Sequence, residues 1–349
     1  MTRQDRGTRR GATIVDVARL SGVSKSTVSN VVHGSAPVAG RTRELVLEAI
    51  EQLGYRPNAL ARDLKRRRTA TIGVVVGDLA NPFFGELTKL IEQSTARADY
   101  AAIICDIDGT PETERQKIAL LREQRVAGIL TMYFGGDAAA LDEVQDADIP
   151  IVGVSVMDPR FDCVVTDDEA GARLAVRHLA ELGHTQIAYV PSNATEASTV
   201  AARLGGWRQA LRANRVRRGP IVALDDASGV RGVVPLERAL RDPNRPTAFF
   251  AGNDTTALQL IDRLEDAGVR VPQDASVVGF DDIWLAGLRR VGLTTVRQPV
   301  AQLAELSVAR LLERIAQSDA DAGGGSAVQT QLAPELIARA TTAPAPPAR

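Results

Sequence analysis

The sequence predicts a small all-α helix-turn-helix head followed by an α/β body of two doubly wound parallel-sheet lobes. Two capped amphipathic segments near the N-terminus predict the head, and short β-rich runs that alternate with longer amphipathic segments predict the body. Charge divides the chain in the same way. Residues 1–68 carry 14 Lys and Arg against 6 Asp and Glu, whereas the other residues carry 28 against 37. A basic head on an acidic body is expected of a protein that contacts phosphate groups at one end.

The first helix is predicted over Ile14–Ser21, with Thr13 as its N-cap and Asp16 at the third helical position, which is a capping-box arrangement. Gly22 permits the left-handed backbone of a tight turn, and Ser24 caps a second helix. This spacing is typical of a helix-turn-helix, whose second helix lies in a major groove of DNA. Any other small helical hairpin is the alternative, and the basic surroundings disfavour it.

A third helix is predicted over Arg43–Leu53, and Gly54 ends it. Pro57 can begin a further helix of about two turns, which is shorter than an isolated helix needs to be stable in water. That helix would need support from DNA, from a partner helix, or from both. The basic run Lys65–Arg68 follows as a solvated linker or a phosphate contact.

The body is predicted to contain more parallel strands than one compact unit holds. We therefore expect two similar halves that divide near residues 160–170, with the stretch from about Pro299 returning to help close both. The predicted strands are Ile72–Val76, Ala101–Cys105, Gly128–Met132, Ile151–Val154, Ile187–Val190, Ile221–Ala223, Ala248–Ala251 and Ser276–Val278. The predicted helices are Phe84–Arg97, Glu112–Arg125, Ala170–Leu182, Arg203–Ala213, Thr256–Ala267 and Val300–Gln317.

Polar and aromatic side chains follow several of these strands. Ligands of open parallel sheets bind beyond the carboxyl ends of the strands, so these side chains are candidates for a binding site. They are Asp78, Asn81, Phe83, Phe84, Ser155, Asn253, Asp254, Asp281, Asp282 and Trp284. Hydrogen-bonding Asn and Asp beside aromatic faces suit a sugar or another small polyol. The alternatives are that Asp281 and Asp282 cap a helix, that Asn253 forms a turn, and that Phe84 belongs to the core.

Bulk properties exclude several classes of protein. No apolar run reaches the roughly 20 residues of a membrane helix, and the arginine-rich N-terminus lacks the apolar centre of a secretory signal, so we expect a cytoplasmic protein with no membrane contact. Cys105 and Cys163 are expected to be buried thiols. The histidines are too scattered for a metal or catalytic cluster. No nucleophile elbow, phosphate loop or His-based dyad accompanies the paired carboxylates, so we expect neither an enzyme nor a cofactor.

The chain resembles the LacI family of transcriptional repressors from Thr13 to about Thr342. The resemblance rests on Val23–Asn30, Leu53–Arg62, Asn81–Phe84, His178–His184, Asn253–Asp254, Val277–Asp282 and Leu293–Pro299. It implies a homodimer, sometimes a tetramer, that binds near-palindromic double-stranded operator DNA. It also implies a body similar to the periplasmic sugar-binding proteins, with a small-molecule effector between two lobes.

For DNA binding, the resemblance implies that Lys25, Ser26 and Asn30 read bases, whereas Thr27 and Ser29 contact phosphates. It implies further contacts from a hinge helix that forms on operator DNA, made by Asn58, Ala61, Leu64 and Lys65. Leu64 would insert into the minor groove, where an apolar wedge unstacks a base step and bends the duplex. Asn30 stands where the family often has Arg; Arg suits the edge of guanine, whereas Asn suits that of adenine. Ala39 stands where a capping Ser is frequent.

For effector binding, the resemblance implies roles for Arg203, Asn253 and Asp281, and Ser155 stands where sugar-responsive relatives often carry Asp. The full predicted set is Asn81, Phe83, Phe84, Ser155, Arg203, Asn253, Asp281 and Trp284. Trp207 is expected in the core, and Trp284 is a candidate to stack on a sugar. The implied function is repression of carbohydrate-utilisation genes under control of a sugar-like effector. The alternatives are a non-sugar ligand such as a purine, an unresponsive pocket, a sugar-uptake protein and a sugar-acting enzyme.

The sequence thus predicts the following domain organisation. It comprises a disordered basic arm (1–12), the helix-turn-helix domain (13–56), the hinge helix and linker (57–68), the two-lobed effector-binding and dimerisation domain (69–342) and a disordered tail (343–349).

Overall fold

Contacts between residues divide the computed structural model into two units, Met1–Thr69 and Ala70–Arg349. We call the first the head and the second the body. The structure describes residues 12–33, 37–55, 69–107, 110–134, 149–192, 197–224, 232–319 and 326–347. The predicted arm (apart from residue 12) and the predicted hinge segment, with Asn58, Ala61, Leu64 and Lys65, lie outside the described residues.

The described part of the head contains three helices, α1 (Ile14–Ser21), α2 (Lys25–His33) and α3 (Gly40–Leu53). Their apolar sides meet in one small core, formed by Val17, Val28, Val31, Val46 and Ala49. Because α1 and α2 are short, they depend on this shared core rather than on their own helical propensity.

The ends of the head helices follow the predicted capping pattern. The Asp16 carboxylate accepts hydrogen bonds from the Thr13 backbone N–H at 2.9 Å and from the Thr13 hydroxyl at 2.7 Å. Gly22 ends α1 with a φ of 69°, in the left-handed region that favours glycine. The third helix begins at Gly40, three residues before the prediction, and Ala39 at its N-cap makes no side-chain cap bond.

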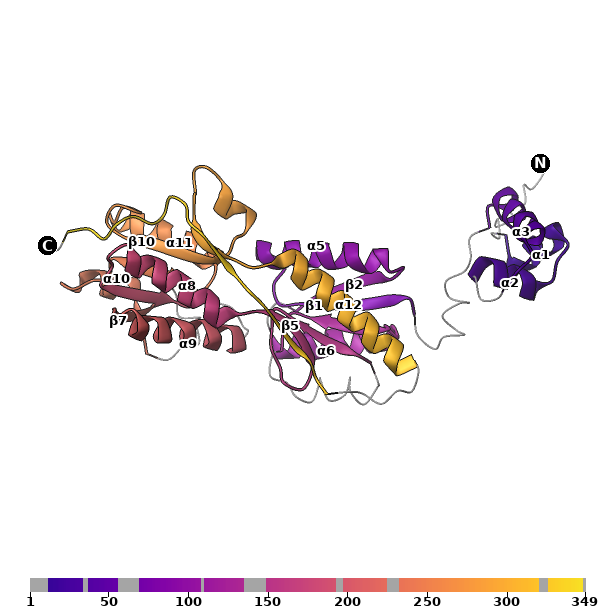
Figure 1. The fold of residues 1–349 in the computed structure, drawn as a ribbon, viewed down its shortest axis with the longest axis horizontal. Helices are drawn as coiled ribbons and strands as arrows, with labels where there is room; N and C mark the ends of the chain where they lie inside the picture. Colours follow the sequence, from indigo (N-terminus) through magenta and orange to yellow (C-terminus); the bar gives the residue numbers. More distant parts are fainter. Residues whose placement is uncertain are drawn as a thin grey trace, which may run out of the picture. The chain divides into compact units, whose positions relative to one another are not determined.

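The body contains two sheets, each covered by helices on both faces (Figure 1). The first sheet has the strand order β12-β5-β4-β3-β1-β2, and the second has β13-β11-β10-β9-β6-β7-β8. The first-sheet strands are β1 (Thr71–Val76), β2 (Ala101–Asp106), β3 (Gly128–Thr131), β4 (Ile151–Val154), β5 (Asp162–Thr166) and β12 (Gln329–Leu332). The second-sheet strands are β6 (Gln186–Val190), β7 (Arg217–Ala223), β8 (Val233–Pro235), β9 (Ala248–Ala251), β10 (Ser276–Asp281), β11 (Thr294–Arg297) and β13 (Glu335–Ile337).

Helices pack on both sheets. We call the first sheet with its helices the first lobe, and the second sheet with its helices the second lobe. The helices are α5 (Pro82–Arg97), α6 (Pro111–Glu123), α8 (Asp168–Glu181), α9 (Ala197–Ala213), α10 (Leu236–Arg241), α11 (Asp254–Asp266) and α12 (Val300–Asp319). In the second lobe, Phe249 packs towards α10 and α11 whereas its neighbour Phe250 packs with α8 and α9. Successive strand residues point to opposite faces, so a strand buried on both faces reads as a continuous apolar run, here Ala-Phe-Phe-Ala.

The chain crosses between the lobes three times, from β5 to α8, from β11 to α12 and from β12 to β13. Residues after Pro299 thus contribute to both lobes, as the sequence predicted. The strands β5, β8, β11, β12 and β13 were missed, as was α10. In the described part of the body, the strand pairings are parallel, as predicted, except that β11 and β13 pair in antiparallel orientation.

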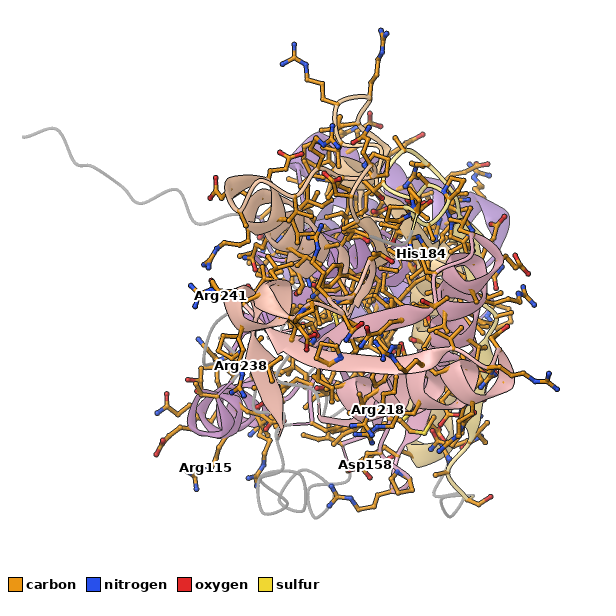
Figure 2. The ribbon with its side chains drawn as sticks, turned by 90° about the vertical axis from the view of Figure 1, so that its left-hand side faces the viewer. Arg115, Asp158, His184, Arg218, Arg238 and Arg241 are labelled. Carbon is orange, nitrogen blue, oxygen red and sulfur yellow. The ribbon has the colours of Figure 1, made fainter. Side chains whose placement is uncertain are left out.

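The prediction of a disordered tail from residue 343 was wrong for residues 343–347. The Ala343 backbone N–H donates to the Ser276 hydroxyl at 3.1 Å, and the His184 Nε2 atom lies 3.2 Å from the Ala343 carbonyl. The Ala345 N–H donates to the Leu182 carbonyl at 2.8 Å. Figure 2 places His184 on the side of the second lobe away from Arg238 and Arg241 of α10. This Pro- and Ala-rich segment is ordered because the side chains of Ser276 and His184 and the backbone carbonyl of Leu182 bind its main chain.

Two further expectations concern the cysteines and membrane-spanning helices. Cys105 and Cys163 are buried free thiols, as predicted, and burial raises the pKa of both. Among the helices that the structure describes, none is long and apolar enough to cross a membrane.

Asp162 at the start of β5 holds the returning C-terminal elements against the first sheet. Its buried carboxylate accepts hydrogen bonds from Arg310 at 2.8 Å, from Arg314, and from the Val328 N–H at 2.6 Å. Burial by itself raises the pKa of Asp162, but the bonds from the two arginines and Val328 outweigh burial and hold the pKa at about 2. The carboxylate therefore stays charged and keeps α12 and β12 in place.

Replacing Asp162 with Asn should lower the free energy of unfolding by about 3 kcal/mol, because two partly buried arginines would lose their carboxylate. Urea unfolding at neutral pH measures this difference. The advantage of the wild type should disappear as the pH falls from about 4 towards 2, because a lowered pKa in the folded state stabilises only while the carboxylate is ionised.

Glu181→Gln is the matched control, since Glu181 forms an exposed pair with Arg177 at 3.8 Å. Its cost should stay below about 0.5 kcal/mol. Equal costs for the two variants would contradict the role given to Asp162.

Candidate functional site

The outer face of α2 carries the residues predicted to meet DNA. Lys25 and Ser26 are exposed and Ser29 and Asn30 are half-buried, whereas Val28 on the opposite side is fully buried. Residues four apart share one face of a helix, which groups Lys25 with Ser29 and Ser26 with Asn30. Thr27 is half-buried near the start of the helix, where its backbone N–H donates to the Ser24 hydroxyl at 3.1 Å. The packing of Val28 in the head core thus determines which side of α2 faces solvent.

A pocket in the body, which we call the cleft, brings together seven of the eight predicted effector residues. It is lined by Asn81, Phe83, Phe84, Ser155, Ser192, Thr199, Arg203, Asn253, Asp281 and Gln298. The first four belong to the first lobe, and the next five belong to the second. The free volume is about 20 Å³, so side chains fill most of the space at this point.

Trp284 is the predicted residue that the structure does not bring to the cleft. It begins a short 3₁₀ helix (Trp284–Gly287), and its side chain is 64% exposed. Trp207, in contrast, is fully buried between α8, α9 and the second sheet, as expected for a core residue.

Two asparagines in the cleft also cap the helices that follow them. The Asn81 side-chain oxygen accepts from the Phe83 N–H at 3.1 Å at the start of α5. The Asn253 oxygen accepts from the Thr256 N–H at 2.8 Å at the start of α11. Capping uses the amide oxygen, so the amide nitrogen is the group that each residue can offer to a ligand.

Ser155 and Asp281 are held in backbone conformations that non-glycine residues rarely adopt. Their φ angles are 59° and 121°, within the left-handed region. The Ser155 N–H donates to the Val164 carbonyl at 2.9 Å, and the Asp281 carboxylate accepts from the Gln298 amide at 2.7 Å. Such conformations persist where the surroundings hold them and are often found at binding sites.

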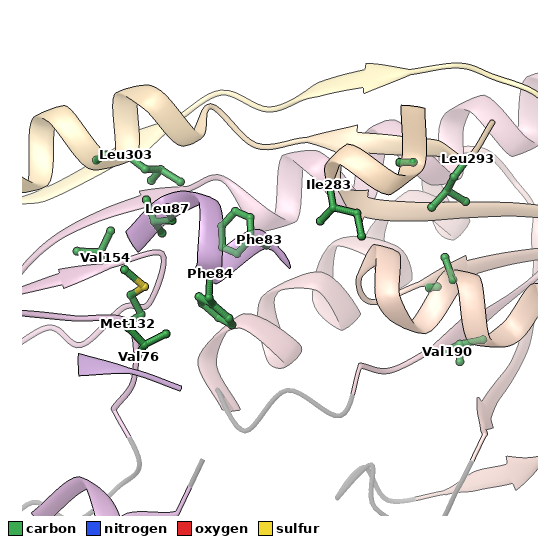
Figure 3. Close-up of a cluster of buried hydrophobic side chains, with 14 of the residues drawn as sticks. Val76, Phe83, Phe84, Leu87, Met132, Val154, Val190, Ile283, Leu293 and Leu303 are labelled. Atoms are coloured by element: carbon green, nitrogen blue, oxygen red, sulfur yellow. The ribbon is translucent and has the colours of Figure 1, made fainter. Parts of the chain in front are cut away.

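Phe83 and Phe84 form the apolar side of the cleft. Their ring centroids lie 5.2 Å apart with an edge-on angle of 68°. Figure 3 shows both rings at the start of α5, between first-lobe side chains such as Met132 and second-lobe side chains such as Ile283. The apolar core therefore continues from one lobe to the other beside the polar residues of the cleft.

Arg203 of α9 is the central cation of the cleft, and protein groups already bind it. Its Nε donates to the Asp168 carboxylate at 2.8 Å, and its Nη1 donates to the Gly252 carbonyl and lies 3.8 Å from Asp281. Its guanidinium also covers the Phe280 ring at 3.7 Å from the centroid. With only 5% of the residue exposed, the charge is tolerated because it is paired and hydrogen-bonded.

Burial raises the pKa of Asp281 to about 7, although Arg203 and the Gln298 amide favour the charged form. Asp254, which accepts from the Ile283 N–H at 2.9 Å and from the Thr295 hydroxyl, has its pKa raised by burial and then by the neighbouring Asp281. A carboxyl group that titrates near neutral pH can serve a ligand as donor or acceptor.

Hydrogen bonds connect the cleft to the crossovers between the lobes. The Gln298 amide nitrogen donates to Asp281, and its oxygen accepts from the Thr166 hydroxyl at 2.6 Å. Thr166 ends β5 and Gln298 follows β11, so one side chain joins two crossovers. The third crossover, which follows β12, is joined to the first, because the Asp167 N–H donates to the Leu332 carbonyl at 2.8 Å. A ligand that contacts Asp281 would therefore be connected by hydrogen bonds to the segments that join the lobes.

Sequence reasoning missed Ser192, Thr199 and Gln298 as cleft residues. Ser192 follows β6, a strand that was predicted, so its position was available as a signal. Gln298 follows β11, which was not predicted. Thr199 lies on the part of α9 before the predicted start at Arg203.

Comparisons with known proteins agree with this arrangement. A family model described as bacterial regulatory proteins, lacI family, matches residues 13–58, and one described as a periplasmic binding protein-like domain matches residues 176–342. The chain is 36% identical over 338 residues to the HTH-type transcriptional repressor PurR of Vibrio atlanticus, covering 95% of this chain and 98% of that protein.

Two solved structures are similar over nearly the whole chain. The lac repressor dimer bound to operator and the anti-inducer ONPF matches with a TM-score of 0.77 and 29% identity, covering 96% of this chain and 100% of that one. The complex of the transcriptional regulator CelR with cellobiose matches with a TM-score of 0.66 and 27% identity, covering 95% and 99%.

Replacing Arg203 with Met should lower the free energy of unfolding by about 3 kcal/mol, because Asp168 and Asp281 would stay buried without their cation. Denaturant unfolding measures the change. Arg208→Met, on the exposed side of the same helix, should change it by no more than about 0.5 kcal/mol. A tolerated Arg203→Met substitution would mean that the guanidinium is not needed to hold the cleft together.

Proposed function

The chain belongs to the LacI family of bacterial regulatory proteins, and from this we propose that it represses transcription as a homodimer on a near-palindromic operator, under control of a purine-like effector. It is a DNA-binding transcriptional repressor. The observation that carries the effector proposal is the cleft, where two aromatic rings face a set of hydrogen-bonding side chains.

The head supports operator binding by the outer face of α2. The basic charge of residues 1–68 supplies phosphate attraction, which is independent of sequence. Base reading is proposed for Lys25, Ser26 and Asn30, and phosphate contacts for Thr27 and Ser29. The hinge segment, with Leu64 as a wedge, completes the proposal; Asn58, Ala61 and Lys65 are assigned to the same DNA contact.

The cleft supports a flat nitrogen heterocycle better than a sugar. The Phe83 and Phe84 rings offer aromatic surface for stacking. Asp281 can donate or accept near neutral pH, and Asn253, Gln298 and Ser192 supply further hydrogen bonds for the edges of a ring. Trp284, the residue expected to stack on a sugar, is outside the cleft. Similarity to repressors named PurR supports the same choice.

A sugar effector is the second candidate. It is favoured by the similar structure of CelR with cellobiose, and by the Asn and Asp side chains that suit hydroxyl groups. In either case the ligand can control DNA binding only as far as its affinity differs between an arrangement of the lobes that favours DNA binding and one that does not.

Asn30→Arg should change the selected operator at one base pair of each half-site from adenine to guanine, because Arg pairs with the O6 and N7 atoms of guanine. Selection from a randomised DNA pool measures the preference, with an expected discrimination of about 1–3 kcal/mol at that position.

Ser29→Ala is the control for this experiment. It should weaken binding to all sequences without changing the selected base, since it removes a proposed phosphate contact. An unchanged operator for Asn30→Arg would remove Asn30 from the set of base-reading residues.

The effector proposal is tested by thermal unfolding of the full-length protein with purine bases and, separately, with simple sugars. A ligand present at about 100 times its dissociation constant should stabilise the protein by about 2.7 kcal/mol, which is a shift of several degrees. A purine base that gives this shift and changes operator affinity supports the proposal. A response to sugars alone would replace it with the second candidate.

A further inference from the structure

A larger cavity lies beside the cleft. Its volume is about 380 Å³, against about 20 Å³ in the cleft, and it falls in the range of small-molecule sites. We call it the side cavity. It is lined by Ser155, Met157, Val165, Thr166, Asp167, Asp168, Glu169, Arg173, Ser198, Thr199, Ala202 and Gln331.

The side cavity and the cleft are neighbours, because Ser155 and Thr199 line both. These residues come from different lobes, and the Thr199 hydroxyl donates to the Ser155 carbonyl at 3.5 Å. That bond is long, so it offers little resistance to a ligand that reaches from one space to the other. A molecule in the cleft that carries a substituent on this side would place it in the side cavity.

The lining indicates what kind of substituent fits. Ser198, Thr199 and Gln331 bring groups that both donate and accept hydrogen bonds, as hydroxyl groups of a ligand require. Asp167, Asp168 and Glu169 bring three carboxylates, of which Asp168 is bound by Arg203. These carboxylates favour a neutral ligand group that donates hydrogen bonds. They disfavour a phosphate, because the negative charges would repel each other.

Arg173 is the one basic side chain among the lining residues, and it is directed to the acidic ones. It lies 3.5 Å from the Glu169 carboxylate and 3.9 Å from that of Asp167. An anionic ligand would have to replace these contacts. The side cavity is therefore not a site for an anion despite the presence of an arginine.

We propose that the side cavity is the second half of the effector site and binds an uncharged polyhydroxylated group attached to the ring in the cleft. With the purine-like ring proposed above, on which this inference rests, the effector class is a ribonucleoside. A free base would leave the side cavity to water, and a nucleotide would bring a phosphate to an acidic wall. Because Thr166, Asp167 and Asp168 belong to the first crossover, such a ligand also contacts the segment that joins the lobes.

The first test is calorimetric titration of the full-length protein with guanine, hypoxanthine and adenine, with their ribonucleosides, and with the nucleoside 5′-monophosphates. A nucleoside should bind about tenfold more tightly than its base, which corresponds to one or two additional net hydrogen bonds. The monophosphate should bind at least about tenfold more weakly than the nucleoside. A base that binds as well as its nucleoside would overturn the inference and leave the purine effector standing.

The second test fills the side cavity without substituting a residue that lines the cleft. Ala202→Leu introduces a larger side chain at a lining position, and Ala201→Leu makes the same change on the exposed side of α9. Ala202→Leu should reduce the ratio of nucleoside to base affinity by about tenfold, because the hydroxyl contacts are lost, whereas Ala201→Leu should not change it.

The outcomes separate this inference from the proposed function. An unchanged ratio in Ala202→Leu overturns the side-cavity assignment even if nucleosides bind. Binding of cellobiose that Ala202→Leu weakens and Ala201→Leu does not would support the polyhydroxyl site and overturn the purine ring. Binding of no base and no nucleoside overturns both.

Discussion

The guanidinium of Arg203 is buried on the second-lobe side of the cleft, and the carboxylates of Asp168 and Asp281 make that burial possible. An isolated charge at this depth would be costly, so these groups have to remain together. Asp168 begins α8 directly after the first crossover, and Asp281 ends the strand β10. The ion pairs therefore fix the start of one helix and the end of one strand relative to α9, which positions most of the second-lobe side of the cleft.

The same residues join the cleft to the segments that connect the lobes. Gln298 and Thr166 continue the hydrogen bonds from Asp281 to two crossovers, while Phe83 and Phe84 continue the apolar core across the cleft. Under the proposed function, a ligand that inserts beside Asp281 would change the environment of this set, and with it the free energy of one arrangement of the lobes relative to another. The side cavity extends the ligand contact to the first crossover itself. In this view, recognition of the effector and control of the lobes are properties of one set of side chains.

Sequence reasoning predicted best where the signal is local. The capping residues Thr13 and Ser24 and the turn at Gly22 placed α1 and α2, because these bonds are made within a few residues. The short strands β5, β8, β11, β12 and β13 were missed because tertiary pairing stabilises them, and a missing β11 concealed Gln298. Trp284 was predicted to lie in the site because it follows Asp281 closely in the sequence, yet the orientation of its side chain depends on a 3₁₀ turn. The bonds of Ala343 and Ala345 to the second lobe are backbone contacts that composition does not reveal.

The central claim is that ligand in the cleft and operator on the head are coupled through the body. The most direct measurement is reciprocal: operator affinity with and without a saturating purine ligand, and affinity for that ligand with and without saturating operator. Thermodynamic linkage requires the two ratios to be equal, and we expect a factor of about 5–150. A ligand that binds the body tightly but leaves operator affinity unchanged, with ligand affinity equally unaffected by operator, would contradict the account.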